Sequence, residues 1–394
     1  MTRKRLAILS THPIQYHSAW FAALAAHPEI DLEVLFCHEA TSREQADAGF
    51  GVEFDWDRPL LKGYRYQFLE NVAARPSLHS FSGLDTPEVA ELIEGNRFDA
   101  VLVNGWHYKS AWQAIRACGR TGTPVMARGD SHLHSRRKIL KRAFKWPFYR
   151  WFIPRLDACL AVGQWSREYY LHYGAKPEQI FLVPHTIDEN YFVRESDRWL
   201  PHRAELRAEW GITNGATVFL FAGKFTDNKR PLDFVRGINY AFQQRPDVVG
   251  LMVGEGPLRG VLEARAGSSP APIRFAGFLN QSEIAKAYVA ADALVLPSAA
   301  ETWGLVVNEA MSCGRPCFVS DQAGCGPDMI VDDETGAVFP MGDTEELGNL
   351  LSRYALNQQR LLSMGLSAKH RMQAHSTNIA VDGVLRALAA VTKE

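Results

Sequence analysis

Short apolar segments recur along the whole chain, and stretches with helical periodicity separate them. The apolar segments lack polar alternation, which is typical of strands whose two faces are both covered by helices. Regular alternation of such strands with helices predicts parallel sheets joined by right-handed crossovers. The predicted strands are 6–10, 32–37, 99–105, 124–129, 158–163 and 180–185 in the first half and 217–223, 248–254, 273–278, 293–298 and 316–321 in the second.

The pattern is interrupted once, over residues 184–201, where polar residues gather. This predicts an α/β protein with two doubly wound domains. The chain then ends in helices only, from Asp343 onward, and Asp343 followed by Glu346 is typical of a helix N-terminus. The predicted domains are 1–190 and 191–375, followed by a C-terminal helix over 376–394 that could pack back on the first domain.

Composition narrows the class of protein. A length of 394 residues suits two domains of ordinary size, and a net charge of −1 gives no general attraction to nucleic acid. The six cysteines form no C-x-x-C pair and no zinc-finger spacing, so buried, reduced thiols of a cytosolic protein are expected. The sequence predicts neither a transmembrane helix nor a signal peptide. We therefore expect a cytoplasmic protein, with the inner face of the membrane as a possible location.

The turns that follow the strands of the second domain carry candidate chemistry, because doubly wound sheets bind ligands beyond the carboxyl ends of their strands. Lys224 and Lys229 follow the strand 217–223, and Pro231 then begins a helix. Two ammonium groups beside a helix N-terminus suit a diphosphate, although lysines in turns are more often simply solvated. Neither G-x-G-x-x-G nor a P-loop motif accompanies them.

The segment LPSAAETWGLVVNEAMSCGRP, residues 296–316, contains two glutamates. Glu301 is expected in a turn, with a helix beginning near Gly304 whose free amides point to the same edge as the lysines. An anion held there gains from the helix dipole and from the cations together. Glu309, one turn into that helix, suits hydrogen bonds from a ribose diol. The alternative is an ordinary helix residue paired with a nearby arginine.

The second half of the chain resembles the retaining family 4 glycosyltransferases of the GT-B fold. The resemblance is strong over residues 180–345 and weaker before them. It implies two Rossmann-like domains with a cleft between them, the first binding an acceptor and the second a nucleotide-sugar. The matching segments are FAGKFTDNKRP, VGEGP, FAGF, VPHTIDENYF and LPSAAETWGLVVNEAMSCGRPCFVS, the last of which carries the Glu-x7-Glu motif of the family as Glu301 and Glu309.

The resemblance implies a role for each residue. Lys224 and Lys229 would bind the diphosphate of the donor, although the family usually has Arg at the first position. Glu301 would face the hydroxyls of the donor sugar, and Glu309 would hold the ribose. Glu301 and Lys229 are also the implied catalytic residues of this domain. The other implied donor contacts are the amides of Trp303, Gly304 and Leu305 and the turn at Gly277 and Phe278, which would receive the base.

The first half departs from the family pattern. The glycine-rich loop expected after the first strand is replaced by STHPIQYHSAW, although some bacterial members carry a similar Thr-His-Pro-Ile-Gln-Tyr stretch. An ordinary turn, with His17 near a helix N-terminus, is the alternative interpretation. Many family members place a residue that serves the reacting centre near the end of the strand matching 124–129. Asp130 is its nearest match in this sequence, and His132 is the alternative. Asp130 is therefore the third catalytic candidate, with Glu301 and Lys229. The acceptor-side candidates are His12, Gln15, Tyr16, Asn104, His107, Arg128 and His132.

Residues 136–155 include eight basic residues and no acidic one. Aromatic and apolar residues recur at every fourth position, and so do basic ones. A basic amphipathic helix of this kind over 136–152 suits an anionic membrane surface. The alternative is a domain helix whose apolar face is core. No nucleic-acid-binding motif accompanies the charge, so no nucleic acid partner is expected.

The predicted function is transfer of a sugar from a nucleotide-sugar to a glycan or lipid-linked glycan, with retention at the anomeric carbon. No metal or other cofactor is expected, because no Asp-x-Asp follows a strand and because lysines and helix amides can neutralise the leaving diphosphate. Two alternatives stay open: a nucleotide-sugar epimerase or hydrolase on the same fold, and a non-catalytic scaffold at the membrane. The base, the sugar and the acceptor are not predicted.

Overall fold

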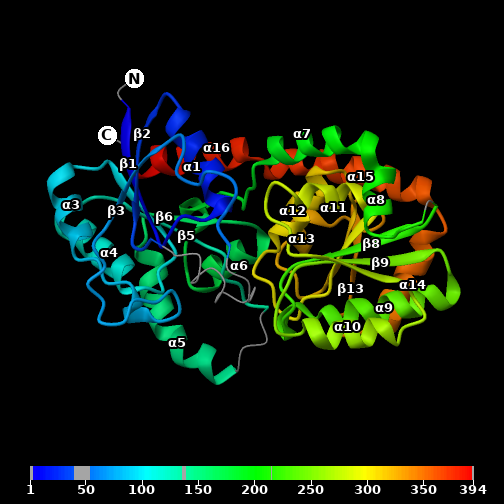
Figure 1. The fold of residues 1–394 in the computed structure, drawn as a ribbon. Coiled ribbons are helices and arrows are strands. Elements are labelled where there is room, and N and C mark those ends of the chain that lie inside the picture. The colour runs from blue at the N-terminus through cyan, green and yellow to red at the C-terminus, as the bar shows by residue number, and fades with distance from the viewer. Residues whose placement is uncertain (1–2, 40–53, 135–138, 214, 393–394) are drawn as a thin grey trace. The chain divides into compact units, whose positions relative to one another are not determined.

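The computed structural model describes residues 3–39, 54–134, 139–213 and 215–392, with backbone only for 139–142. The described residues form two compact units (Figure 1). Unit 1 comprises residues 3–39, 59–134, 139–187 and 375–392, and unit 2 comprises residues 54–58, 188–213 and 215–374. No helix in these described ranges is long and apolar enough to cross a membrane.

Unit 1 is built on a seven-stranded sheet of order β3-β2-β1-β4-β5-β6-β7, in which every pairing is parallel. Its strands are β1 (Lys4–Ser10), β2 (Ile30–Phe36), β3 (Arg65–Phe68), β4 (Ala100–Asn104), β5 (Val125–Gly129), β6 (Ala158–Ala161) and β7 (Ile180–Leu182). Its helices are α1 (Gln15–Ala26), α3 (Glu88–Asn96), α4 (Lys109–Thr121), α5 (Ile139–Phe152), α6 (Gln164–His172) and α16 (Thr377–Val391), with short 3-10 turns such as η3 (Ile153–Arg155) between them.

Helices cover both faces of this sheet, which explains why its strands lack polar alternation. Successive side chains of a strand point to opposite faces. In β1, Leu6 and Ile8 accordingly belong to a core with α1 and α16, whereas Ala7 and Leu9 belong to a core with α3 and α4. The C-terminal helix α16 thus packs on unit 1, where it contacts α1, β6 and β7.

Unit 2 is built on a six-stranded parallel sheet of order β10-β9-β8-β11-β12-β13. Its strands are β8 (Thr217–Ala222), β9 (Val248–Val253), β10 (Ile273–Gly277), β11 (Ala293–Leu296), β12 (Cys317–Ser320) and β13 (Gly336–Phe339). Its helices are α7 (Glu189–Trp199), α8 (Arg203–Glu209), α9 (Pro231–Gln244), α10 (Arg259–Gly267), α11 (Ile284–Ala290), α12 (Leu305–Ser312), α13 (Gly326–Met329), α14 (Thr344–Ala355) and α15 (Gln358–Arg371), with the 3-10 turn η6 (Asp227–Lys229) before α9.

The α/β class and the parallel sheets predicted from the sequence are confirmed, and every predicted strand is present. Two edge strands were not predicted. β3 has polar residues and two exposed positions, and β13 is a short edge strand of four residues that begins at a glycine. The N-cap at Asp343 is confirmed, since its Oδ1 accepts a hydrogen bond of 2.9 Å from the amide of Glu346. The six cysteines are buried thiols, as expected.

Residues 54–58 differ from the sequence-based domain limits, which place them in the first domain. In the structure they belong to unit 2, because they bond to the loop that follows β10. The side-chain amide of Asn280 donates to the carbonyl of Asp55 at 2.7 Å, and the amide of Ser282 donates to the Asp57 carboxylate at 3.1 Å. Arg58 completes the attachment through an ion pair of 2.6 Å with Asp188.

Candidate functional site

The strand order of unit 2 indicates where the candidate site lies. The chain order reverses between β8 and β11, and such a switch point leaves a crevice at the carboxyl ends of the two strands. Lys224 and Lys229 lie in the turn after β8, and Glu301 lies in the loop after β11. Asn228 holds the two turns together, because its carbonyl accepts from the Ala299 amide and its side chain donates to the Ala300 carbonyl, both at 2.8 Å.

The charged groups of these turns lie close enough to influence one another. The ammonium of Lys229 pairs with Oε2 of Glu301, and the hydroxyl of Ser298 donates to the same oxygen at 3.3 Å. Burial lowers the pKa of Lys224, and the positive charge of Lys229 lowers it further. Two ammonium groups and one carboxylate carry a net charge of +1, so this partly buried cluster favours an anion.

A second loop fixes the backbone around Glu301. The amide of Glu301 donates to the carbonyl of Gln322 at 3.2 Å, and the amide of Gly324 donates back to the carbonyl of Glu301 at 2.9 Å. The amide of Cys325 donates to the carbonyl of Trp303 at 3.0 Å. The two loops can come this close only because residue 324 is a glycine. A Cβ on Gly324 would lie 2.0 Å from the carbonyl oxygen of Thr302. The carboxylate of Glu301 is therefore carried on a rigid turn.

Helix α12 begins directly after this turn. Gly304 is its N-cap, with a φ of 103° that disfavours any side chain, as the sequence predicted for a helix starting near this glycine. The first amides of a helix have no intrahelical acceptor, so those of α12 are directed to the edge that carries Glu301. The indole of Trp303 points into the core, where it donates to Asn308 at 2.9 Å. This ring is therefore part of the core.

Glu309 lies in the second turn of α12 and is only 5% exposed. The hydroxyl of Tyr288, on α11, donates to its Oε2 at 2.6 Å. This bond joins α11 to α12 and orients the carboxylate. The alternative given in the sequence analysis paired Glu309 with a nearby arginine. No local pattern in the sequence indicated Tyr288 as its partner.

The turn that would receive the base ends β10. Gly277 has a φ of +74°, and its carbonyl accepts from the amide of Gly254 at 2.9 Å, which fixes the turn against the next one. The ring of Phe278 packs on the ring of Phe54 with centroids 4.6 Å apart, and Trp56 meets Phe54 at 4.8 Å. Sequence reasoning missed Phe54 and Trp56, which reach this turn from a segment far away in the chain.

In unit 1, candidates gather at the corresponding switch point, after β1 and β4. The side-chain nitrogen of Asn104 lies 3.2 Å from Nδ1 of His17, in the first turn of α1. Burial, assisted by the positive charge of Arg128, lowers the pKa of His17 to about 3, so this ring is neutral at ordinary pH. His12 lies in the loop before α1 and contacts the hydroxyl of Thr11 at 3.0 Å. Gln15 and Tyr16 occupy the first two positions of α1.

Arg128 is buried and not displayed to solvent. It donates to the carbonyl of Pro184 at 3.1 Å and to Nδ1 of His185 at 3.3 Å, and its guanidinium lies 4.8 Å from the ring centroid of Trp20. A ring that accepts at Nδ1 carries its proton on Nε2. This nitrogen of His185 lies 3.9 Å from the carboxylate of Asp130. The ring of His185, which the sequence analysis did not single out, thus lies between Arg128 and Asp130.

Asp130 and its rival His132 have different surroundings. The side chain of Asp130 is 43% exposed, at the carboxyl end of β5. The ring of His132 packs on the ring of Trp165, at the start of α6, with centroids 5.0 Å apart. The ring of His107 packs at a tilt against that of Tyr108 with centroids 3.9 Å apart, and burial lowers the pKa of His107. Asp130 and His132 are both partly buried, so burial does not separate the two candidates.

Two family models match the chain. The model described as "Glycosyl transferases group 1" matches residues 202–371, and the model described as "Glycosyltransferase Family 4" matches residues 34–191. A D-inositol 3-phosphate glycosyltransferase of Streptomyces bingchenggensis is 30% identical over 287 residues, which are 68% of this chain and 60% of the relative. The chain spans between about half and three-fifths of the length of the first such relatives.

Solved structures share the fold. A glycosyltransferase from Rickettsia africae superposes with a TM-score of 0.77 at 14% identity, over 100% of both chains. Anabaena HepE in complex with UDP-glucose superposes with a TM-score of 0.70 at 16% identity, over 98% of this chain and 99% of that one. The two parallel α/β sheets match those of GT-B proteins.

Proposed function

The chain belongs to the family 4 glycosyltransferases of the GT-B fold, and from this premise we propose that it transfers a sugar from a nucleotide-sugar to a glycan or lipid-linked glycan. One observation carries the proposal. The switch point of unit 2 is where a doubly wound sheet binds its ligand. Four groups meet there: Lys224, Lys229, Glu301 and the first amides of α12. A cationic cluster beside a helix N-terminus favours a diphosphate.

The donor would lie along the carboxyl edge of unit 2. In this arrangement the diphosphate meets Lys224, Lys229 and the amides at the start of α12, and Glu301 accepts hydrogen bonds from the sugar. Glu309, oriented by Tyr288, accepts from the ribose diol. Support for a nucleotide-sugar comes from Anabaena HepE, which shares the fold and was solved with UDP-glucose.

Lys229 must change partner when the donor binds. Its ammonium pairs with Glu301 in the structure, and a diphosphate carries the larger negative charge. Transfer of Lys229 to the phosphate would release Oε2 of Glu301 to accept a sugar hydroxyl. The ion pair would thus keep the two donor-binding groups in position until the donor arrives.

We propose that the reaction retains the anomeric configuration and uses no metal. The bond between the anomeric carbon and the diphosphate breaks, and the acceptor oxygen bonds to the same face of that carbon. The hydroxyl proton of the acceptor passes to the departing phosphate oxygen. The two lysines and the amides of α12 would stabilise the charge on the leaving diphosphate. On unit 1, Asp130, which lies beside His185, would orient the acceptor.

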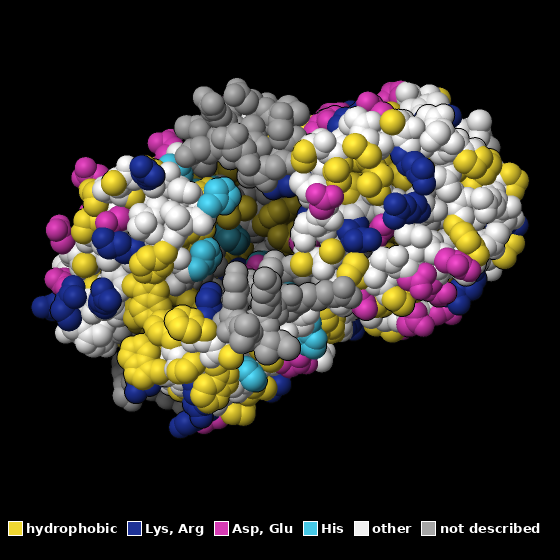
Figure 2. All heavy atoms as spheres, turned by 90° about the horizontal axis from the view of Figure 1, so that it is seen from below, with side chains coloured by type: hydrophobic (Ala, Val, Ile, Leu, Met, Phe, Trp, Pro, Cys, Tyr) yellow, Lys and Arg dark blue, Asp and Glu magenta, His cyan; other side chains and the backbone are white. Residues whose placement is uncertain are grey.

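The acceptor side of the proposal includes an anionic membrane surface. On α5, Phe144 is 88% exposed, and Trp146, Phe148 and Trp151 are each more than 40% exposed. Seen from the side on which α5 lies, hydrophobic side chains gather next to Lys and Arg side chains (Figure 2). Exposed aromatic rings with basic neighbours suit the boundary between headgroups and acyl chains. The helix predicted from the sequence begins earlier, at residue 136. Its first three basic residues lie outside the described residues: Arg136, Arg137 and Lys138.

Binding and transfer can be tested separately. Nucleotide-sugars with different bases and sugars are screened by thermal shift, since a ligand that binds only the folded state raises the melting temperature. The donor found is then incubated with membrane extracts, and the configuration of the product is determined. We expect one donor class to raise the melting temperature and to yield an elongated, retained glycan. Release of free sugar independent of acceptor would instead indicate a hydrolase, and the absence of any binding would overturn the proposal.

A further inference from the structure

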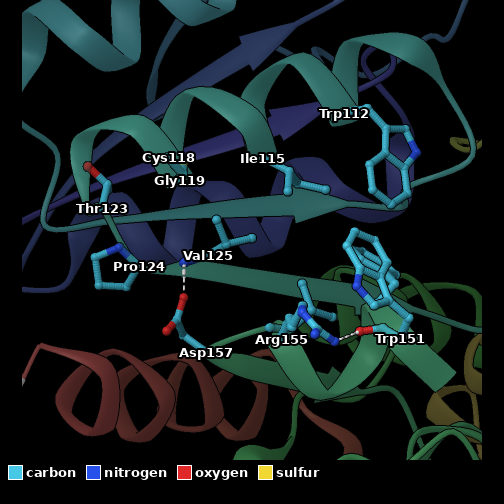
Figure 3. Close-up of a pocket in the computed structure, with 13 residues that line it drawn as sticks. Trp112, Ile115, Cys118, Gly119, Thr123, Pro124, Val125, Trp151, Arg155 and Asp157 are labelled. Atoms are coloured by element: carbon cyan, nitrogen blue, oxygen red, sulfur yellow. Dashed lines mark hydrogen bonds between the residues drawn. The ribbon is translucent and has the colours of Figure 1, made fainter. Parts of the chain in front are cut away.

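A groove of about 340 Å³ in unit 1 has no part in the proposed transfer. It runs along α4 from Trp112 to Gly122, a span of about 15 Å at the rise of an α-helix. Its other wall is the end of α5 with η3 and the residues before β6. Figure 3 shows Trp112 and Trp151 at one end of the groove, and Pro124 and Asp157 at the other.

The lining of the groove is mostly apolar. Ile115 and Val125 contribute aliphatic side chains, and Phe152 packs on Trp112 with centroids 4.6 Å apart. Gly119 leaves the wall of α4 open, because a Cβ added there would meet no atom within 4 Å. Burial raises the pKa of the Cys118 thiol to about 12, so this group also stays uncharged. A long, narrow, apolar groove of this kind suits a hydrocarbon chain.

The mouth of the groove is continuous with the exposed aromatic face of α5. Trp151 belongs to both, being 52% exposed and lining the groove. Phe148, 45% exposed, packs on Trp112 with centroids 5.4 Å apart. A chain entering beside these rings would come from the surface that α5 presents to a membrane.

The charge beside the groove indicates the headgroup. The guanidinium of Arg155 lies 4.9 Å from the ring centroid of Trp151 and donates to the carbonyl of the same residue at 2.5 Å. Within the described residues, Arg155 forms no ion pair with a carboxylate. The one carboxylate in the lining, Asp157, accepts from the amide of Val125 at 2.7 Å. Arg155 therefore offers an anionic headgroup a cation at the groove mouth.

We propose that this groove binds one acyl chain of an anionic membrane phospholipid, with the headgroup on Arg155. The lipid would anchor unit 1 and would not be the acceptor, because the groove extends to the amino end of β5, whereas the acceptor candidates follow the carboxyl ends of β4 and β5. The inference rests on the proposed membrane contact of α5 and is independent of the transfer reaction.

The test measures binding of dihexanoyl phosphatidylglycerol, a monomeric probe, to the full chain by calorimetric titration. The Gly119→Leu variant fills the groove, and Gly95→Leu is its control, because Gly95 also lies in a helix of unit 1 with open space around a built Cβ. We expect one lipid to bind per chain, Gly119→Leu to weaken binding at least about tenfold, and Gly95→Leu to leave it unchanged. If Gly119→Leu does not fold, Ile115→Glu replaces it. Ile115 is half-buried in the lining, and a carboxylate there would disfavour an acyl chain.

Three results would overturn the proposal: no binding of the probe, equal binding by the filled variant, or equal binding of glycerol 3-phosphate, which has no chains. Dihexanoyl phosphatidylcholine tests the headgroup, and an affinity equal to that of phosphatidylglycerol would refute the role of Arg155. Sedimentation with anionic vesicles measures the α5 contact separately. A wild type that sediments but does not bind the probe refutes the groove alone.

Discussion

The hydroxyl of Tyr288 donates a hydrogen bond of 2.6 Å to Oε2 of Glu309, and both side chains are buried. This pairing joins α11 to α12 and holds the second glutamate of the Glu-x7-Glu motif in one orientation. Glu301, the first glutamate, is instead held by a lysine and by a loop whose glycine permits close approach. The two carboxylates are thus positioned independently, which fits separate roles toward two sugars of one donor.

The variant Glu309→Gln should weaken donor binding or lower turnover by about tenfold or more. It keeps the size of the side chain and removes its charge, and a hydrogen bond to a charged group contributes about 1.5–3 kcal/mol. Tyr288→Phe should have a smaller effect, because it frees the carboxylate to rotate without removing it. Steady-state kinetics and the melting temperature are measured for both. Wild-type kinetics in Glu309→Gln would contradict the ribose role.

Replacing both Lys224 and Lys229 by Ala should weaken binding of the nucleoside diphosphate far more than that of the nucleoside, because only the former carries the phosphates. Calorimetric titration with each ligand measures the difference. Lys286, a partly buried lysine of the same unit that pairs with Glu283, provides the control variant Lys286→Ala. Equal losses for the two ligands would show that the lysines do not contact the phosphates.

Gly324→Ala should lower both stability and donor affinity. Its Cβ would lie 2.0 Å from the carbonyl of Thr302, so the turn that carries Glu301 must shift. Overpacking of this kind typically costs about 1–3 kcal/mol. Gly267→Ala is the control, since Gly267 ends α10 with no atom within 4 Å of a built Cβ. A donor affinity unchanged in Gly324→Ala would mean that the turn tolerates displacement.

Much of this site could be predicted because it depends on local pattern. The apolar runs predicted β8 and β11, and the residues that follow them fall at the switch point whatever the details of packing. The turn at Glu301 and the helix start at Gly304 were predicted correctly for the same reason. The roles proposed for these residues remain predictions.

The rest depends on contacts between distant residues, which a single sequence does not reveal. Tyr288 reaches Glu309 from another helix, and Asp57 bonds to Ser282 across 225 residues of chain. His185 meets Arg128 only because β7 brings it past the end of β5. The edge strand β3 was missed because an exposed edge does not need the continuous apolar run of a central strand.

Acid should destabilise unit 1 through His17. Its pKa in the fold is about 3, below the ordinary value of 6.5, so the unfolded chain binds more protons between these two values. Stability from this group is complete above pH 6.5 and is lost as the pH falls toward 3, at up to about 1.4 kcal/mol per pH unit. In His17→Gln the loss of stability from pH 6.5 to pH 4.5 should be smaller than in the wild type.

Chemical denaturation at the two pH values measures this difference, with His172→Gln, at an exposed position of α6, as the control. His185 is also buried, and burial with the charge of Arg128 lowers its pKa well below the ordinary value, so part of the acid sensitivity should persist in His17→Gln. An identical pH dependence in the wild type and in His17→Gln would show that His17 is not held neutral by the fold.

The aromatic face of α5 decides whether the protein meets a membrane. Replacing Phe144 and Trp146 by Ser should abolish binding to anionic vesicles while leaving the melting temperature unchanged, because both side chains are exposed. Lys145→Glu should weaken binding mainly at low salt, since a basic residue near an anionic surface contributes about 1 kcal/mol and salt screens it. Leu366→Ser, at an exposed position on α15, should bind vesicles as the wild type does. A wild type that ignores anionic vesicles at low salt would refute the membrane contact and would favour an acceptor free in solution.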